Sequence, residues 1–189
     1  MIAMTANDTC YSTMKGHWAG VFNTDGLERD HIDIEEARSA LDFKIEKHPS
    51  YDAHGNELTG HFHLRRDTDD AFIPCPAVGA KFQPVQHLEV FDYICNKIMP
   101  EVPDMKLETV GTLHGAGTGL VTATVGDKFS INGDDSPHTM RLLFSNPCGR
   151  GSLVLGFTSV RIFCQNCISA ARKEARKDGF FVRHTSGAG

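Results

Sequence analysis

Between residues 107 and 157 the chain alternates runs of β-forming residues with short turns. This pattern constrains the fold more than any other feature. Successive side chains of a strand point to opposite faces, and short turns join neighbouring strands in antiparallel order. We therefore predict an antiparallel β-meander. Its expected strands cover residues 107–113, 120–125, 128–131, 139–145 and 152–157.

Apolar residues at steps of three and four predict two helices that pack on this meander. The first covers residues 85–98. The second, longer helix begins from a cap at Thr158 or Ser159 and ends at Gly179. Its apolar face consists of Val160, Cys164, Cys167, Ile168, Ala171 and Ala175. The expected architecture is an α+β fold in which the antiparallel β-meander is packed by the long C-terminal helix and the other helix, a β-β-β-α core.

Smaller elements are expected before the meander. Asp33 can cap a short helix that ends near Asp42. Alternation over residues 43–48 and 58–64, around a turn at 53–56, predicts a β-hairpin.

The remaining segments complete the predicted organisation. Prolines restrict residues 72–78 to an edge strand or a bulge, and residues 180–184 return as a strand. We divide the chain into an N-terminal arm (1–32), a single α+β domain (33–185) and a loose tail (186–189).

Charge is distributed unevenly along the 189 residues. The net charge is −5, and hydrophobic and charged residues make up 40% and 23%, which is typical of a folded protein. Residues 1–140 hold 11 Lys and Arg against 22 Asp and Glu, a balance of −11. Residues 141–189 hold 8 against 2, a balance of +6. A surface that binds anions is therefore expected in the last fifty residues.

No apolar stretch is long enough to span a bilayer, and the N-terminus lacks the pattern of a secretory signal. We expect no membrane partner and a reducing, cytoplasmic location. Disulfides are rare in such a reducing compartment, so the cysteines are expected to be thiols. They are Cys10, Cys75, Cys95, Cys148, Cys164 and Cys167.

Two groups of residues have some features of a metal site. Cys164 and Cys167 have the spacing of a zinc pair, but no second pair matches them, so we interpret both as buried core thiols. His61 and His63 share one face of a strand before the acidic turn 67–70, where a hydrolytic metal site could begin. Neither group is complete, and the sequence has no catalytic triad or paired carboxylates. We expect no catalytic residue, no metal and no cofactor.

Basic residues cluster in and around the last predicted helix. A solvated helix face explains some of them, but Phe180 and Phe181 stand beside them. Cations bind phosphates and aromatic rings stack on bases, so this combination favours nucleic-acid binding. The candidate binding residues are Arg141, Arg150, Arg161, Arg172, Lys173, Arg176, Lys177 and Arg183.

Several sequence blocks occur in an order that resembles one known family. They are VGAKFQPVQ (78–86), FD (91–92), LETVG (107–111), LFSN (143–146), FTSVRIFCQN (157–166) and RHT (183–185). The chain resembles the phage/plasmid-like family that carries domain of unknown function 932, over about residues 60–185. His87 replaces the usual Asn of that family, and Cys167 replaces the usual Thr. The resemblance implies a setting of phage or plasmid DNA replication or recombination, and therefore a cytoplasmic location in a bacterial host cell.

The predicted order of elements is also similar to the fold of single-strand annealing proteins of the Rad fifty-two, RecT and Redβ kind. We therefore expect a protein that binds and anneals single-stranded DNA in recombination or replication. It would act without a cofactor, as a homo-oligomeric ring or filament.

Two alternatives stay open. One is a metal-dependent nuclease or hydrolase that uses His61, His63 and the turn 67–70. The other is a phage protein that binds a host factor through the acidic residues 1–140 and does not bind DNA.

Overall fold

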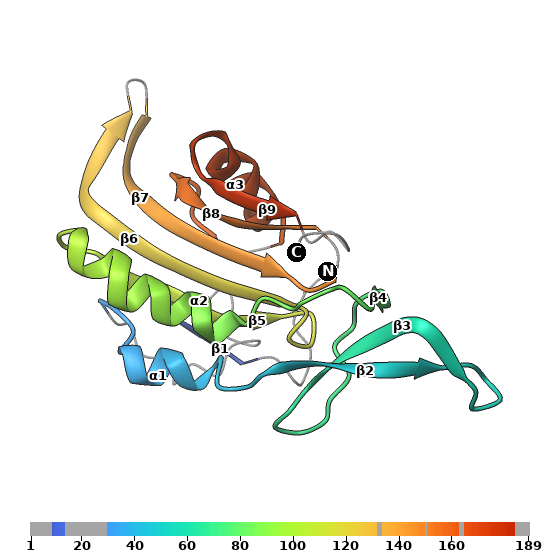
Figure 1. The fold of residues 1–189 in the computed structure, drawn as a ribbon. Coiled ribbons are helices and arrows are strands. Elements are labelled where there is room, and N and C mark those ends of the chain that lie inside the picture. The colour runs from blue at the N-terminus through green and yellow to red at the C-terminus, as the bar shows by residue number, and fades with distance from the viewer. Residues whose placement is uncertain (1–8, 14–29, 132–133, 150, 163–164, 184–189) are drawn as a thin grey trace.

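A computed structural model describes residues 9–13, 30–131, 134–149, 151–162 and 165–183 (Figure 1). They form an α+β fold with antiparallel strands, which confirms the predicted fold class. The strands are β1 (Cys10–Ser12), β2 (Ile45–Tyr51), β3 (Glu57–Arg66), β4 (Val78–Gly79), β5 (Lys106–Leu113), β6 (Thr118–Ile131), β7 (Asp134–Pro147), β8 (Ser152–Thr158) and β9 (Phe180–Arg183). The helices are α1 (Ile34–Ser39), α2 (His87–Tyr93), the π-helical turn η1 (Ile94–Ile98), the 3₁₀ turn η2 (Met99–Glu101) and α3 (Gln165–Asp178).

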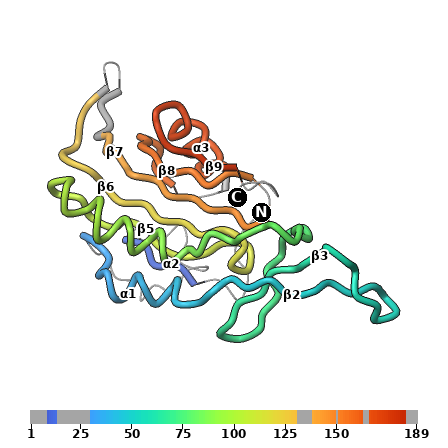
Figure 2. Tube along the Cα trace, viewed as in Figure 1, coloured from blue at the N-terminus to red at the C-terminus, as the bar shows by residue number. Residues whose placement is uncertain are grey.

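The predicted meander forms the centre of a six-stranded sheet with the order β1-β5-β6-β7-β8-β9. The expected strands 120–125 and 128–131 are one long strand, β6, whose pairing with β7 shifts between Val125 and Phe129. β9 confirms the expected strand after the last helix, and it forms one edge of the sheet. The two long strands β6 and β7 continue well beyond β5 and β8 (Figure 2).

The predicted N-terminal arm contributes residues 10–12 to this sheet as β1, which pairs with β5. Cys10 is fully buried there. A side chain at Gly111 would collide with the backbone of Thr9 and Cys10, so glycine permits this close pairing. The other described residues of the arm are 9, 13 and 30–32.

The two faces of the sheet pack against different helices. Phe91 of α2 belongs to one buried cluster with Val121 and Phe144. Ile168 of α3 belongs to a second cluster with Leu143 of β7. Val121 and Leu143 point to opposite faces because their strands alternate, so helices cover both sides of the sheet.

Helix α3 begins at Gln165, so the predicted cap at Thr158 or Ser159 is wrong. Thr158 is the last residue of β8, and its hydroxyl donates a 2.6 Å hydrogen bond to the carboxylate of Glu174. The Ser159 hydroxyl donates to the same carboxylate at 3.0 Å. These two side chains therefore contact the side of α3 and do not cap its first turn. Cys167 is only half-buried on α3, in contrast to its predicted core position, and Cys164 lies outside the described residues.

Two glycines bring α3 into close contact with β8. A side chain at Gly156 would collide with the carbonyl oxygen of Ala175, in the last turns of the helix. Gly179 follows the helix, as predicted, and a side chain there would meet the carbonyl oxygens of Ala175 and Leu155. Gly179 has no left-handed φ, so close packing and not a left-handed cap requires glycine at this position.

The smaller sheet has the order β2-β3-β4. Its β2–β3 hairpin confirms the predicted one and projects away from the large sheet (Figure 1). The short strand β4 lies at the edge of this sheet, in agreement with the proline-rich segment that precedes it. Asp33 caps α1 as expected, because its carboxylate accepts the backbone N–H groups of Glu35 and Glu36 at 2.9 and 3.2 Å. Within the described residues, no helix is long and apolar enough to cross a membrane.

Candidate nucleic-acid interface

Three of the predicted cations lie exposed on α3. The helix buries Ile168 and two alanines against the sheet, and this spacing turns Lys173, Arg176 and Lys177 toward solvent. The acidic residue of the same turns, Glu174, binds Thr158 and Ser159 on the other flank. Burial alone would raise the pKa of Glu174, but these hydrogen bonds outweigh it and lower the pKa, so the carboxylate stays ionised at that flank.

Arg172 has a different role from its neighbours because it is half-buried between α3 and the sheet. Its guanidinium donates hydrogen bonds to the Ser145 hydroxyl on β7 and, at 2.6 Å, to the Ser152 carbonyl on β8. Burial, together with the nearby charge of Arg176, lowers the pKa of Arg172. Arg172 therefore fixes α3 on the sheet and sets the positions of the exposed cations.

Strand β9 places an aromatic ring beside these cations. Phe181 pairs with Val154 of β8, whose side chain belongs to the buried cluster under α3, so Phe181 points to the helix side of the sheet. The guanidinium of Arg176 lies over its ring at 4.9 Å from the centroid. Arg183 is two residues further along the exposed strand and shares this side. We call Lys173, Arg176, Lys177, Phe181 and Arg183 the α3–β9 surface.

The α3–β9 surface combines two kinds of recognition group. Its four cations can each neutralise a backbone phosphate. Phe181 is 47% exposed, so its ring can still accept a stacked base. The arrangement needs no bond-making chemistry, and it suits a flexible polyanion with unpaired bases.

Arg141 is buried and lies apart from the α3–β9 surface. Its guanidinium forms a two-pronged ion pair with Glu108 of β5, with Nε–Oε2 and Nη2–Oε1 distances of 2.7 and 2.9 Å. A third hydrogen bond goes from Nη1 to the carbonyl of Thr139 at 3.0 Å. Arg141 and Arg161 line the same polar hollow. Arg150 lies outside the described residues.

The sequence analysis missed Lys128 and His138, which line the same hollow as Arg141. A two-residue turn at 132–133 would place Phe129 opposite residue 136, but the shifted register pairs Phe129 with His138. Such a shift between long strands has no readable signal in the residue pattern. The alternation of β6 and β7 alone therefore did not identify the two side chains.

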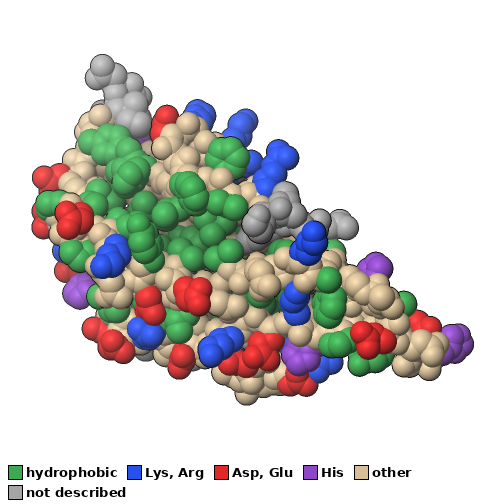
Figure 3. Space-filling view, viewed as in Figure 1, with side chains coloured by type: hydrophobic (Ala, Val, Ile, Leu, Met, Phe, Trp, Pro, Cys, Tyr) green, Lys and Arg blue, Asp and Glu red, His purple; other side chains and the backbone are tan. Residues whose placement is uncertain are grey.

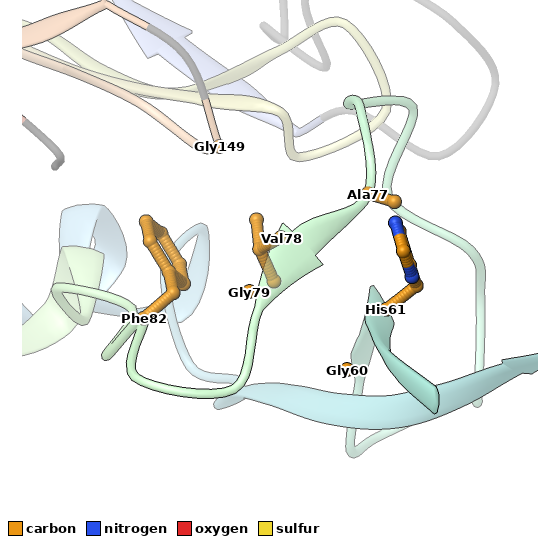
Figure 4. Close-up of a pocket in the computed structure, with 7 residues that line it drawn as sticks. All are labelled: Gly60, His61, Ala77, Val78, Gly79, Phe82 and Gly149. Atoms are coloured by element: carbon orange, nitrogen blue, oxygen red, sulfur yellow. The ribbon is translucent and has the colours of Figure 1, made fainter. Parts of the chain in front are cut away.

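A further hollow of about 370 Å³ lies beside β4 (Figure 4). The His61 side chain points toward Ala77, away from Phe82. None of the described lining residues is a Lys, Arg, Asp or Glu, so this part of the lining offers little to a phosphate. They are Gly60, His61, Ala77, Val78, Gly79, Phe82 and Gly149.

The nuclease alternative requires a metal between the histidine pair and the acidic turn, but two arginines at the end of β3 pair with acidic residues of that turn. The Nε2 atom of His63 accepts a 2.9 Å hydrogen bond from Arg65, and burial and the Arg65 charge lower the pKa of His63. Arg65 also pairs with Asp70, and Arg66 pairs with Asp69. In the described part of the chain, no three histidine, cysteine or acidic residues are placed to hold a metal ion. No observation favours this alternative.

Comparison with known families gives one match. Residues 75–189 match the family described as "Domain of unknown function (DUF932)", somewhat less of the chain than the sequence blocks suggested. No curated protein and no solved structure matches the chain. The similarity to single-strand annealing proteins therefore stays a prediction.

The buried Glu108–Arg141 pair generates a test by double substitution. We expect Glu108→Leu and Arg141→Met each to lower the free energy of unfolding by about 3–5 kcal/mol, because each leaves a buried charge without its partner. The double variant should lose much less free energy of unfolding than the two single variants added together, since both buried charges are removed. Urea unfolding measures all three. The control is Asp70→Asn, which breaks the solvent-exposed ion pair between Arg65 and Asp70. It should lower the free energy of unfolding by less than about 1 kcal/mol. Additive losses would show that the two side chains are not coupled.

Proposed function

The chain belongs to the "Domain of unknown function (DUF932)" family, and from that premise we propose that it binds single-stranded DNA and anneals complementary strands in phage or plasmid recombination and replication. The observation that carries this proposal is the α3–β9 surface, where an exposed aromatic ring lies among exposed cations. A nucleic acid with unpaired bases offers phosphates to the cations and a flat base to Phe181. A duplex keeps its base faces stacked inside, so it cannot use the ring.

The charge distribution supports the same proposal. Residues 1–140 carry a balance of −11 and repel a polyanion, whereas residues 141–189 carry +6 and contain the α3–β9 surface. A bound strand is therefore confined to one part of the molecule. Its affinity should depend on salt, because each cation that contacts a phosphate releases counterions.

Annealing requires bound bases to stay open to pairing. A base stacked on Phe181 presents its flat face to the protein and leaves its hydrogen-bonding edge accessible to a second strand. Lys173, Arg176, Lys177 and Arg183 hold the backbone in this arrangement. The complementary strand can then pair without any covalent step, which requires no cofactor.

The proposal includes assembly into a homo-oligomeric ring or filament. The opposite side of β8 and β9 carries exposed Phe157, Phe180 and Val182, next to half-buried Leu155. Hydrophobic side chains also gather over the middle of the large sheet in the space-filling view (Figure 3). β9 is an edge strand with all four residues exposed, so its backbone can pair with a strand of a second copy while the apolar side chains become buried. Assembly would align several α3–β9 surfaces along one DNA strand.

DNA binding is tested by fluorescence anisotropy with a labelled oligothymidine and the matching duplex, over a salt gradient. We expect preference for the single strand. Phe181→Ala should weaken binding by about 1–3 kcal/mol through lost stacking. Removing Arg176 and Lys177 together should reduce the slope of log affinity against log salt by about 1.4, at about 0.7 for each lost contact.

The matched control is Lys97→Ala, which removes an exposed cation from η1, on the other side of the sheet. This variant should bind like the unmodified protein. Equal binding to single strand and duplex, or equal losses in Lys97→Ala and the α3 variants, would contradict the proposal.

Assembly is tested by light scattering with and without oligothymidine. We expect an oligomer for the unmodified chain and a shift toward monomer for the double variant Phe157→Ser and Phe180→Ser. Tyr51→Ser is the control, because Tyr51 is equally exposed but lies on the small sheet. A monomeric mass for the unmodified chain, both free and with DNA, would refute the assembly.

A further inference from the structure

A polar hollow of about 330 Å³ lies at the far end of the large sheet, and we propose that it binds the phosphate monoester of a nucleotide. Its basic lining residues are Lys128, His138, Arg141 and Arg161. The other described lining residues are Glu108, Thr124, Thr139 and Ser159. Lys128 and His138 do not belong to the α3–β9 surface, so this site goes beyond the proposed function.

The strand pattern explains why the hollow forms at this place. Leu120 and Leu143 lie under α3 on the helix side of β6 and β7. Further along the same side, the residues become polar, and Thr124 stands opposite Arg141. β8 ends at Thr158, the partner of Arg141, whereas β6 continues to Ile131 and β7 begins at Asp134. The large sheet therefore extends beyond the part that helix α3 covers, and this uncovered part presents a polar surface.

The buried ion pair supplies a rigid floor. Glu108 is neutralised by Arg141, and the Thr122 hydroxyl lies 3.4 Å from the same carboxylate. A guanidinium has five N–H groups, and the bonds to Glu108 and Thr139 use three of them. Within the described part of the chain, two N–H groups of this fixed cation are therefore left to donate to a ligand oxygen in the hollow that Arg141 lines.

Charge and size identify the class of ligand. The described lining residues include three Lys or Arg side chains and one carboxylate, a formal balance of +2, which matches the dianion of a phosphate monoester better than the single charge of a phosphodiester. The volume is near the lower end of small-molecule pockets, about 300–1,000 Å³. This size suits one nucleotide and excludes a duplex. The phosphate can come from a free nucleoside monophosphate or from the phosphorylated end of a DNA strand.

Isothermal titration calorimetry tests the site with the full chain and four probes: dAMP, deoxyadenosine, inorganic phosphate and sulfate. We expect dAMP to bind at least tenfold more tightly than deoxyadenosine. Lys128→Ala and Arg161→Ala should each weaken dAMP binding about tenfold, because each removes a charged donor. Both residues are exposed, so these variants should unfold at the same temperature as the parent. Lys97→Ala should bind dAMP normally.

The source of the phosphate is separated with oligothymidines that carry a 5′-phosphate or a 5′-hydroxyl. If the site holds strand ends, the 5′-phosphate should raise affinity about tenfold, and Lys128→Ala should abolish this gain. If the site holds free nucleotides, dAMP should bind, and the oligonucleotides with a 5′-phosphate and with a 5′-hydroxyl should have the same affinity. Either result supports a phosphate-monoester site.

Two outcomes would overturn the site. The first is no detectable binding of dAMP. The second is binding of phosphate, sulfate or dAMP that does not change in Lys128→Ala and Arg161→Ala, which would indicate an adventitious ion only. Failure of the site is distinguishable from failure of the proposed function, because Arg176 and Lys177 variants act on oligothymidine binding and leave dAMP binding unchanged.

Discussion

Helix α3 can lie on β8 only if position 156 has no side chain. A methyl group at Gly156 would occupy the space of the Ala175 carbonyl oxygen, and one at Gly179 would occupy that of Leu155. This contact fixes the end of the helix over the strand that pairs with β9. Arg176 is consequently held above Phe181, so the α3–β9 surface depends on a glycine that contributes no recognition group itself.

Local patterns predicted much of the fold. Strand alternation gave the meander and the β2–β3 hairpin, and the short side chain of Asp33 before Glu35 and Glu36 gave the start of α1. The start of α3 was not predictable in this way. Thr158 and Ser159 have the residue types of a helix cap, but their hydroxyls bind Glu174, which is more than a full helical turn into α3. A non-local partner outcompeted the local signal.

In the candidate site, too, some features were predictable from the sequence and others were not. The excess of positive charge after residue 140 was visible in the sequence, but the role of each cation was not. Arg141 finds its partner 33 residues away, on a strand whose register is shifted, and Arg172 reaches the backbone of β8. Burial therefore separates cations that support the fold from cations that face solvent. This separation depends on tertiary contacts that spacing along one helix cannot reveal.

The central claim is that single-stranded DNA lies along α3 and β9. Ultraviolet cross-linking of oligothymidine to the full chain, followed by mass spectrometry of the linked peptides, locates the strand directly. The account predicts that cross-links concentrate in residues 165–183, with Phe181 among the linked positions. Cross-links confined to residues 45–66, on the projecting β2–β3 hairpin, would contradict it.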